Sequence, residues 1–154
     1  MKQILVLIFS VFILNLFAQE NISYQRPSDE ILELVDIQLA PTVLISDNNE
    51  YMVLLYRDAY STIEELSQEE LRLGGLRIDP VTNIGSRVTY YNNISIKKLN
   101  KNKSDVIAVS GLPSSPRLAN LTWSPDQQKI AFTNTTTEGV SIWVLNLKDA
   151  TVKK

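Results

Sequence analysis

The chain has 154 residues, of which 44% are hydrophobic and 21% charged, and its formal net charge is −2. This composition is ordinary for a globular domain, and so small a charge gives no reason to expect nucleic acid as a partner. The sequence contains no cysteine and no histidine, which excludes disulfides, thiolate zinc sites and any Ser-His-Asp triad made within this chain. We therefore expect no cofactor and no metal site.

Residues 1–18 have the features of a secretory signal peptide. Lys2 supplies a positive start, residues 4–14 are apolar apart from Ser10, and Ala18 is a small residue at the exit. A membrane anchor is the alternative, but a helix that spans the bilayer needs about 20 apolar residues. Cleavage after Ala18 predicts an exported protein, periplasmic or secreted, with no stable membrane span afterwards. Because no cysteine follows, we expect a bacterial envelope protein.

Residues 19–41 form a lead-in with one short helix, which Ser28 can cap at residues 29–34. Residues 42–110 then predict a first sheet of four strands, interrupted by an insertion at 58–87. Short apolar runs between turn signals indicate the strands, at 42–46, 51–56, 88–97 and 105–109.

The insertion at 58–87 is predicted to be helical. Ser61–Glu64 and Ser67–Glu70 each have the spacing of a capping box, in which a hydroxyl and a carboxylate satisfy opposite backbone donors. Gly74–Gly75 would end the helix. Three leucines could form its apolar face: Leu66, Leu71 and Leu73.

Residues 111–154 predict a second, truncated sheet with strands at 119–124, 129–134 and 139–147, the chain stopping where a fourth strand would begin. Its first hairpin repeats an earlier one. Aligned without gaps, residues 45–54 fall on 123–132, so that Ser46 matches Ser124 and Asn48 matches Asp126. Repetition of one supersecondary unit is typical of repeat architectures.

The fold class predicted from these features is mainly β. We expect an incomplete β-propeller of about one and a half to two four-stranded antiparallel blades, with a short helical insertion, after a cleavable signal peptide. So few blades cannot close a ring and would leave apolar sheet faces exposed. The alternative is a small independent β-sandwich made of the same strands.

One stretch is distinctive beyond its secondary structure. Residues 70–80, with the sequence ELRLGGLRIDP, continue through Thr82-Asn83 and Ser86-Arg87 to Tyr90-Tyr91. This run resembles secreted peptidases of the prolyl oligopeptidase family, in particular the glutamyl endopeptidase-like branch. Supporting matches are Pro27 with Glu30-Ile31, Gly111-Leu112-Pro113, and Trp123-Ser124-Pro125-Asp126 with Gly139-Val140.

The resemblance implies an N-terminal propeller that covers the active site of a C-terminal α/β-hydrolase domain and limits which peptides enter. The nucleophile, aspartate and histidine of such a protein lie in the hydrolase domain, and nothing here matches a Gly-x-Ser-x-Gly nucleophile elbow. We therefore expect no catalytic residue in this chain and predict it to be inactive alone, with a peptide substrate and the hydrolase domain as partners in the complete protein.

Arg72, Arg77 and Arg87 lie inside the distinctive run and are the candidate substrate-binding residues. An arginine can hold a carboxylate through two parallel hydrogen bonds, which would suit a peptidase that selects glutamate. The structural alternative is that these arginines pair with Asp79, Glu69 or loop carbonyls and fix the insertion.

Two functions follow as hypotheses. The first is the N-terminal propeller portion of an exported serine-type peptidase, which contributes gating and substrate selection. The second is a non-enzymatic, TolB-like propeller that acts as a binding protein of the bacterial envelope. A degraded gene, whose product does not fold, is a third possibility because of the exposed final strand.

Overall fold

A computed structural model describes residues 25–99 and 105–154. The predicted signal peptide, residues 1–18, lies outside the described residues. The chain divides into two units, and the boundary in the sequence falls between Val35 and Asp36. In the first, the described part holds one helix, α2 (Asp29–Val35), whose start is marked by the carbonyl of Ser28 accepting from the amides of Ile31 and Leu32, both at 3.0 Å. Across residues 25–99 and 105–154, no helix has the length and apolar character needed to cross a bilayer.

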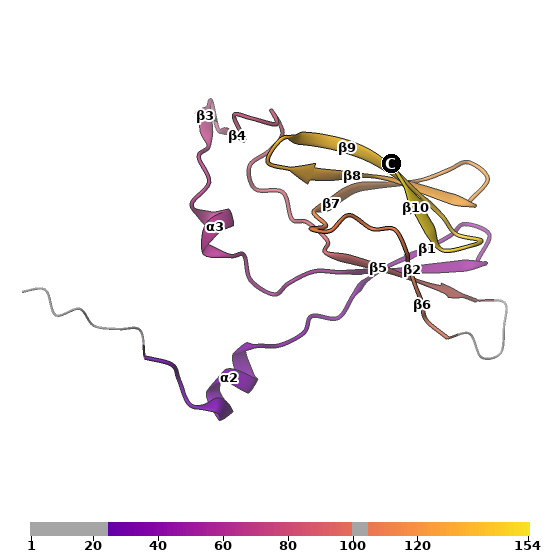
Figure 1. Ribbon diagram of the computed structural model, residues 1–154, viewed down its shortest axis with the longest axis horizontal. Coiled ribbons are helices and arrows are strands. Elements are labelled where there is room, and N and C mark those ends of the chain that lie inside the picture. The colour runs from indigo at the N-terminus through magenta and orange to yellow at the C-terminus, as the bar shows by residue number, and fades with distance from the viewer. Residues whose placement is uncertain (1–24, 100–104) are drawn as a thin grey trace, which may run out of the picture. The chain divides into compact units, whose positions relative to one another are not determined.

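The second unit is built on two four-stranded antiparallel sheets (Figure 1). In each sheet the strands lie side by side in the order in which they occur along the chain. The first sheet contains β1 (Thr42–Ile45), β2 (Tyr51–Tyr56), β5 (Asn93–Lys98) and β6 (Ile107–Ala108). The second contains β7 (Leu118–Trp123), β8 (Lys129–Thr136), β9 (Gly139–Asn146) and β10 (Thr151–Lys153). The prediction of a mainly β fold is confirmed, and the described sheets form no closed barrel.

The second sheet has its fourth strand, which corrects the prediction that this sheet is truncated. Ala150 has φ 54, which turns the chain back after β9. β10 then pairs antiparallel with β9, with Val152 opposite Leu145, and Val152 is only 7% exposed. A strand of three residues suffices because Val152 adds its side chain to the core.

The insertion is mostly not helical, which corrects a second prediction. Its helix, α3 (Ile63–Leu66), is a single turn with the capping box at Thr62 and Glu65, one residue beyond the predicted Ser61–Glu64. A two-stranded hairpin follows, made of β3 (Leu71–Leu73) and β4 (Leu76–Ile78). Gly74 and Gly75 form its two-residue turn with φ 57 and 95, and two consecutive positive φ values are what a tight hairpin turn needs. The glycine pair therefore reverses a strand instead of ending a helix.

The repeated hairpins agree in their hydrogen bonds. In the first, the Ser46 hydroxyl donates to Asn48 Oδ1 at 2.7 Å and accepts from the Tyr51 amide at 3.0 Å. In the second, the Ser124 hydroxyl donates to Asp126 Oδ1 at 2.6 Å and accepts from the Lys129 amide at 2.9 Å. The following residues, Asn49 and Gln127, have φ 54 and 56. The predicted repeat of the two hairpins is confirmed.

One hydrophobic core lies between the two sheets. Every residue of it belongs to a strand of one of the sheets or to the turn before β10: Tyr51, Val53, Leu55, Ile94, Ile96, Leu118, Ile130, Phe132, Leu145, Leu147, Ala150 and Val152. Trp123 and Trp143 are partly buried and pack against this core, as expected for large aromatic side chains between sheet faces. The two repeated turns also touch, because Gln127 Nε2 donates to Asp47 Oδ2 at 3.2 Å and the Asp47 amide donates to Gln127 Oε1 at 3.1 Å.

The two sheets contact each other through faces that do not correspond in the repeat. Val53 of β2 is fully buried against the second sheet, but its repeat partner Ala131 alternates with the buried Ile130 and Phe132 and so points away from the first sheet. Conversely, Ile130 is fully buried, whereas its repeat partner Met52 lies on the outward face of the first sheet. One face of the first sheet thus packs on the opposite, non-equivalent face of the second sheet.

Both outward faces expose apolar side chains. On the first sheet, Val43 and Ile45 of β1 are 46% and 49% exposed. On the second, the outward row of β9 includes Ile142, which is 68% exposed, with Val140 and Val144 on either side of it. Each outward face is therefore apolar, as is the equivalent face of the other sheet, which is buried.

Gly111 fixes the crossing from the first sheet to the second. Its φ is +84, and a Cβ at this position would lie 2.8 Å from the carbonyl oxygen of Val152 in β10. Gly74 also has a positive φ, +57, but a Cβ there would meet nothing within 4 Å. A substitution at Gly74 therefore tests backbone strain alone, whereas one at Gly111 adds a steric clash.

We predict that Gly111→Ala destabilises the chain more than Gly74→Ala. The change at Gly74 should cost about 1–2 kcal/mol from the left-handed backbone alone, and the clash with Val152 should add about 1–3 kcal/mol at Gly111. Urea unfolding followed by circular dichroism measures both. Equal losses at the two positions would contradict the close contact between residue 111 and β10.

Candidate functional site

Three arginines surround one carboxylate in the insertion. Arg77 Nη1 donates to Glu70 Oε1 at 2.5 Å, and Arg72 Nη2 lies 3.1 Å from the same oxygen. Arg87 is more distant, with Nε 3.5 Å from Glu70 Oε2. The hydroxyl of Ser86 also donates to Oε2, at 2.9 Å. The Glu70 side chain is only 15% exposed.

These contacts keep Glu70 ionised far into the acid range. The hydrogen bond from Ser86, then the hydrogen bond and charge of Arg77, and finally the charge of Arg87 lower the pKa of Glu70 from 4.5 to about 2, although burial acts in the opposite direction. Through Arg72 of β3 and Arg77 of β4, the carboxylate joins the two strands of the hairpin to each other and to the loop at 86–87. It therefore acts as the anchor of the insertion.

The arginines predicted from the sequence, Arg72, Arg77 and Arg87, are thus brought together, and Glu70 is the residue that unites them. The acidic partners expected for a structural role were Glu69 and Asp79. Glu69 is exposed, and Asp79 instead accepts from the amides of Val81 and Thr82 at 2.8 and 2.9 Å. Only Arg87 of the three also lines the pocket described next. Substrate binding by the three arginines stays a prediction.

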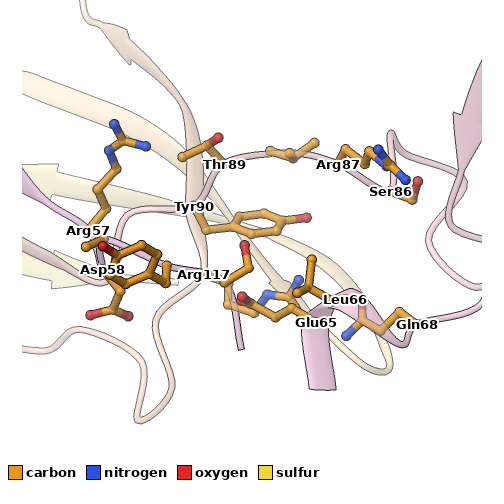
Figure 2. A pocket seen from close by; sticks show the side chains of 14 residues that line it. Arg57, Asp58, Glu65, Leu66, Gln68, Ser86, Arg87, Thr89, Tyr90 and Arg117 are labelled. Atoms are coloured by element: carbon orange, nitrogen blue, oxygen red, sulfur yellow. The ribbon is translucent and has the colours of Figure 1, made fainter. Parts of the chain in front are cut away.

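A pocket of about 350 Å³ lies beside this cluster. Figure 2 shows Tyr90 across its centre with Arg117 against it, Arg57 and Asp58 at one end and Ser86 and Arg87 at the other. The walls come from the segment that follows β2, from α3, from the loop before β5 and from Arg117, which precedes β7. Its full lining is Arg57, Asp58, Ala59, Tyr60, Ser61, Glu65, Leu66, Gln68, Ser86, Arg87, Val88, Thr89, Tyr90 and Arg117.

Arg117 is held firmly next to the pocket. Its guanidinium carbon lies 4.4 Å from the centroid of the Tyr90 ring, a cation–π distance. Its amide donates to Asn134 Oδ1 at 2.9 Å, and its carbonyl accepts from the Thr135 amide at 3.1 Å. The Nε atom is buried and has no hydrogen-bond partner among the described residues.

The two carboxylates of the pocket already have partners. Asp58 Oδ1 accepts from Asn92 Nδ2 at 2.9 Å, and Glu65 Oε2 accepts from the Thr62 amide at 3.1 Å in the capping box. Within residues 25–99 and 105–154, neither Arg57 nor Arg117 is in a salt bridge. Among the same residues Asp58 and Glu65 are in no salt bridge either, so the pocket presents charges of both signs.

Three pocket residues are not predictable from a sequence motif: Arg57, Tyr90 and Arg117. Arg57 follows β2 and Arg117 precedes β7, sixty residues further along the chain, and neither belongs to a motif that indicates a ligand. The predicted strand at 88–97 begins only at Asn93, which leaves Tyr90 in a loop beside the pocket. In the described part of the chain, no group of three or more acidic residues is placed to hold a metal ion.

Two curated plant proteins are similar to this chain. Over 133 residues, 28% are identical to "Probable glutamyl endopeptidase, chloroplastic" of Oryza sativa subsp. japonica. Over 111 residues, 30% are identical to the Arabidopsis thaliana protein of the same name. The alignments cover 81% and 71% of this chain, which spans only 14% and 12% of the length of these relatives. No family model and no solved structure matches the chain.

This similarity supports the resemblance stated from the sequence in its coarser form. The chain is distantly related to one segment of proteins named as glutamyl endopeptidases. Since the relatives are several times longer than the matched segment, what they do as whole proteins is taken up only as a proposal below.

We predict that Glu70 makes stability depend on pH in the acid range. Its pKa is about 2 in the folded chain and lies near 4.5 when unfolded, so its stabilising contribution is complete above about pH 4.5 and is lost as the pH falls through about 2. Glu70→Gln lacks this ionisation. The stability difference between the parent chain and Glu70→Gln should therefore be largest near neutral pH and shrink towards pH 2, as measured by urea unfolding at several pH values.

Glu69→Gln is the matched control, because it removes the same charge from the exposed neighbouring residue. Its effect should be small and should not follow the Glu70 profile. A Glu70→Gln deficit that stays constant between pH 7 and pH 2 would contradict the anchoring role of the carboxylate.

Proposed function

We propose that this chain is the N-terminal part of an exported serine-type peptidase related to the glutamyl endopeptidases, and that it contributes gating and substrate selection. The observation that carries the proposal is the similarity to two proteins named as glutamyl endopeptidases over 71–81% of the chain. The chain contains no histidine, so a serine peptidase would need residues outside it to complete its triad.

The packing of the sheets supports a propeller as the form of this part. When one sheet packs its front face on the back face of the next sheet, the contact is heterologous. Repetition of such a contact produces either a ring or an open array. A sandwich would need only the two sheets and would leave no reason for two apolar outward faces. The exposed Ile45 and Ile142 are then the surfaces on which further four-stranded units pack.

Gating follows from the position of the pocket in such an assembly. The pocket is lined mainly by the insertion and by the loop before β5, which contribute nothing to the core, so its lining can vary without disturbing the sheets. A propeller that precedes a hydrolase domain can select peptides by the groups it presents to them. This division gives the chain a role in recognition and leaves bond cleavage to the hydrolase domain.

A non-enzymatic, TolB-like binding protein of the envelope is the competing function, since the same sheets would serve it equally well. The coding sequence downstream of the codon for Lys154 separates the two. Further blade sequences followed by Gly-x-Ser-x-Gly and by later aspartate and histidine codons would support the peptidase. Further blades followed by a stop codon would support the binding protein.

We predict that purified residues 19–154 hydrolyse no peptide substrate, because a chain without histidine cannot form the triad. A panel of fluorogenic peptides with glutamate, aspartate, proline or alanine before the scissile bond tests this. Sustained turnover that co-purifies with the chain through several columns would contradict the assignment of catalysis to residues outside it.

A further inference from the structure

We propose that this chain binds a second copy of itself head to tail, through the outward faces of its two sheets. The outward face of the second sheet in one copy packs on the outward face of the first sheet in the next copy. The contact between the sheets within the chain is the template, because it joins equivalent faces. The inference does not rest on the proposed function, since it concerns surfaces that this chain itself presents.

The sequence repeat assigns a front and a back to each sheet. The front carries Val53 in the first sheet and its repeat partner Ala131 in the second, and the back carries Met52 and its repeat partner Ile130. Within the chain, the front of the first sheet is buried against the back of the second. The front of the second sheet and the back of the first lie outward. They are the same two kinds of face as the pair already in contact.

The front of the second sheet leaves uncovered an apolar row that the first sheet buries. Val53 pairs with Ile96 in the first sheet, and its repeat partner Ala131 pairs with Val144 in the second. Val144 therefore corresponds to Ile96, which is fully buried, but is itself 39% exposed. Two residues earlier in β9, Ile142 continues this row and is 68% exposed. The equivalent surface in the first sheet is covered by another sheet.

The back of the first sheet offers the complementary apolar surface. Val43 and Ile45 of β1 are 46% and 49% exposed, and they pair with Leu54 and Met52 of β2. Lys97 lies opposite Met52, and a lysine side chain is long enough to carry its charge to the rim of a contact. The formal net charge of −2 gives little repulsion between copies. Both faces therefore gain from being removed from water together.

The contact between copies lacks one feature of the contact within the chain. Within the chain, Asp47 and Gln127 exchange two hydrogen bonds between the repeated turns. In the repeat alignment Pro125 takes the place of Asp47, and Asn49 takes the place of Gln127. A proline has neither an amide hydrogen nor a side-chain acceptor. We therefore expect reversible association with a roughly micromolar dissociation constant, the weak end for interfaces of standard size.

Sedimentation velocity of the full 154-residue chain tests the inference with two variants that each block one face. Ile142→Arg blocks the front of the second sheet, and Ile45→Arg blocks the back of the first. The parent chain should associate as its concentration rises, and each variant alone should associate at least about tenfold more weakly. Their equimolar mixture should form a 1:1 complex, because each variant keeps the face that the other has lost. A parent chain that stays monomeric well above micromolar concentration, or a mixture without a complex, would overturn the inference.

Ile63→Arg is the matched control. It makes the same change at an isoleucine of α3 that is 86% exposed and lies outside both sheets, so association should change by less than about twofold. A loss as large as that of Ile142→Arg would mean that added charge, and not a particular face, governs association. The apolar run at residues 4–14 is present in every variant; association through it would survive both blocks and would likewise contradict the inference.

A gain of affinity tests the same contact without removing anything from it. Asn49→Gln combined with Pro125→Asp would restore between copies the pair of side chains that joins the two turns within the chain. Asn49 and Gln127 share a left-handed backbone, with φ 54 and 56, so glutamine fits at position 49. The double variant should associate at least about threefold more tightly than the parent chain. Unchanged or weaker association would contradict the front-to-back geometry.

Thiol labelling at varied protein concentration gives an independent readout. The thiol of Ala131→Cys should react readily with a maleimide in the dilute chain and become protected as the concentration rises. A labelling rate that does not depend on concentration would count against burial of this face between copies.

The outcome is separable from that of the proposed function. Further blade units in a longer chain would compete for the same two faces, but they would not change how the 154-residue chain itself associates. A downstream hydrolase sequence together with a monomeric chain would keep the peptidase and reject the self-association. Head-to-tail association without a downstream hydrolase would do the reverse.

Discussion

The contact between non-equivalent faces of two repeated sheets is the constraint on which the rest of this structure depends. Val53 and Ile130 are both fully buried at that contact, yet the sequence repeat places them on opposite faces of their own sheets. Hydrophobic burial between the sheets thus fixes their order and direction. The two repeat-related turns, at Asp47 and Gln127, are hydrogen-bonded to each other and so join equivalent ends of the two sheets. Because the contact joins a front to a back, it can be repeated.

The insertion depends on this framework but is organised by a different kind of interaction. Its residues contribute nothing to the buried core, and its order comes from a single carboxylate with three arginines and a serine around it. Polar contacts of this kind are directional, so they can hold loops in place where too few apolar side chains are available. The pocket borders the arginine side of this cluster through Ser86 and Arg87. The hydrophobic core and the pocket are therefore formed by separate parts of the chain.

Sequence predicted the sheets well because their signals are local. The Ser46 and Ser124 turns could be aligned from sequence alone, and their hydrogen bonds agree atom for atom in the structure. The insertion was mispredicted because Ser67–Glu70 has the spacing of a capping box, whereas Glu70 is used by Arg77 and Ser86 instead. Gly74-Gly75 fits a helix end and a hairpin turn equally well. The pocket could not be predicted, since Arg57, Tyr90 and Arg117 meet only after the sheets have formed.

Thiol labelling tests the central claim most directly, because the chain contains no cysteine of its own. Single cysteines would be placed at two pairs of repeat-related positions, Val53→Cys with Ala131→Cys and Ile130→Cys with Met52→Cys. The account predicts that the thiols at 53 and 130 are protected from a maleimide in the folded chain, whereas those at 131 and 52 react readily. Similar protection within each repeat-related pair would show that equivalent faces pack together, and would contradict the account.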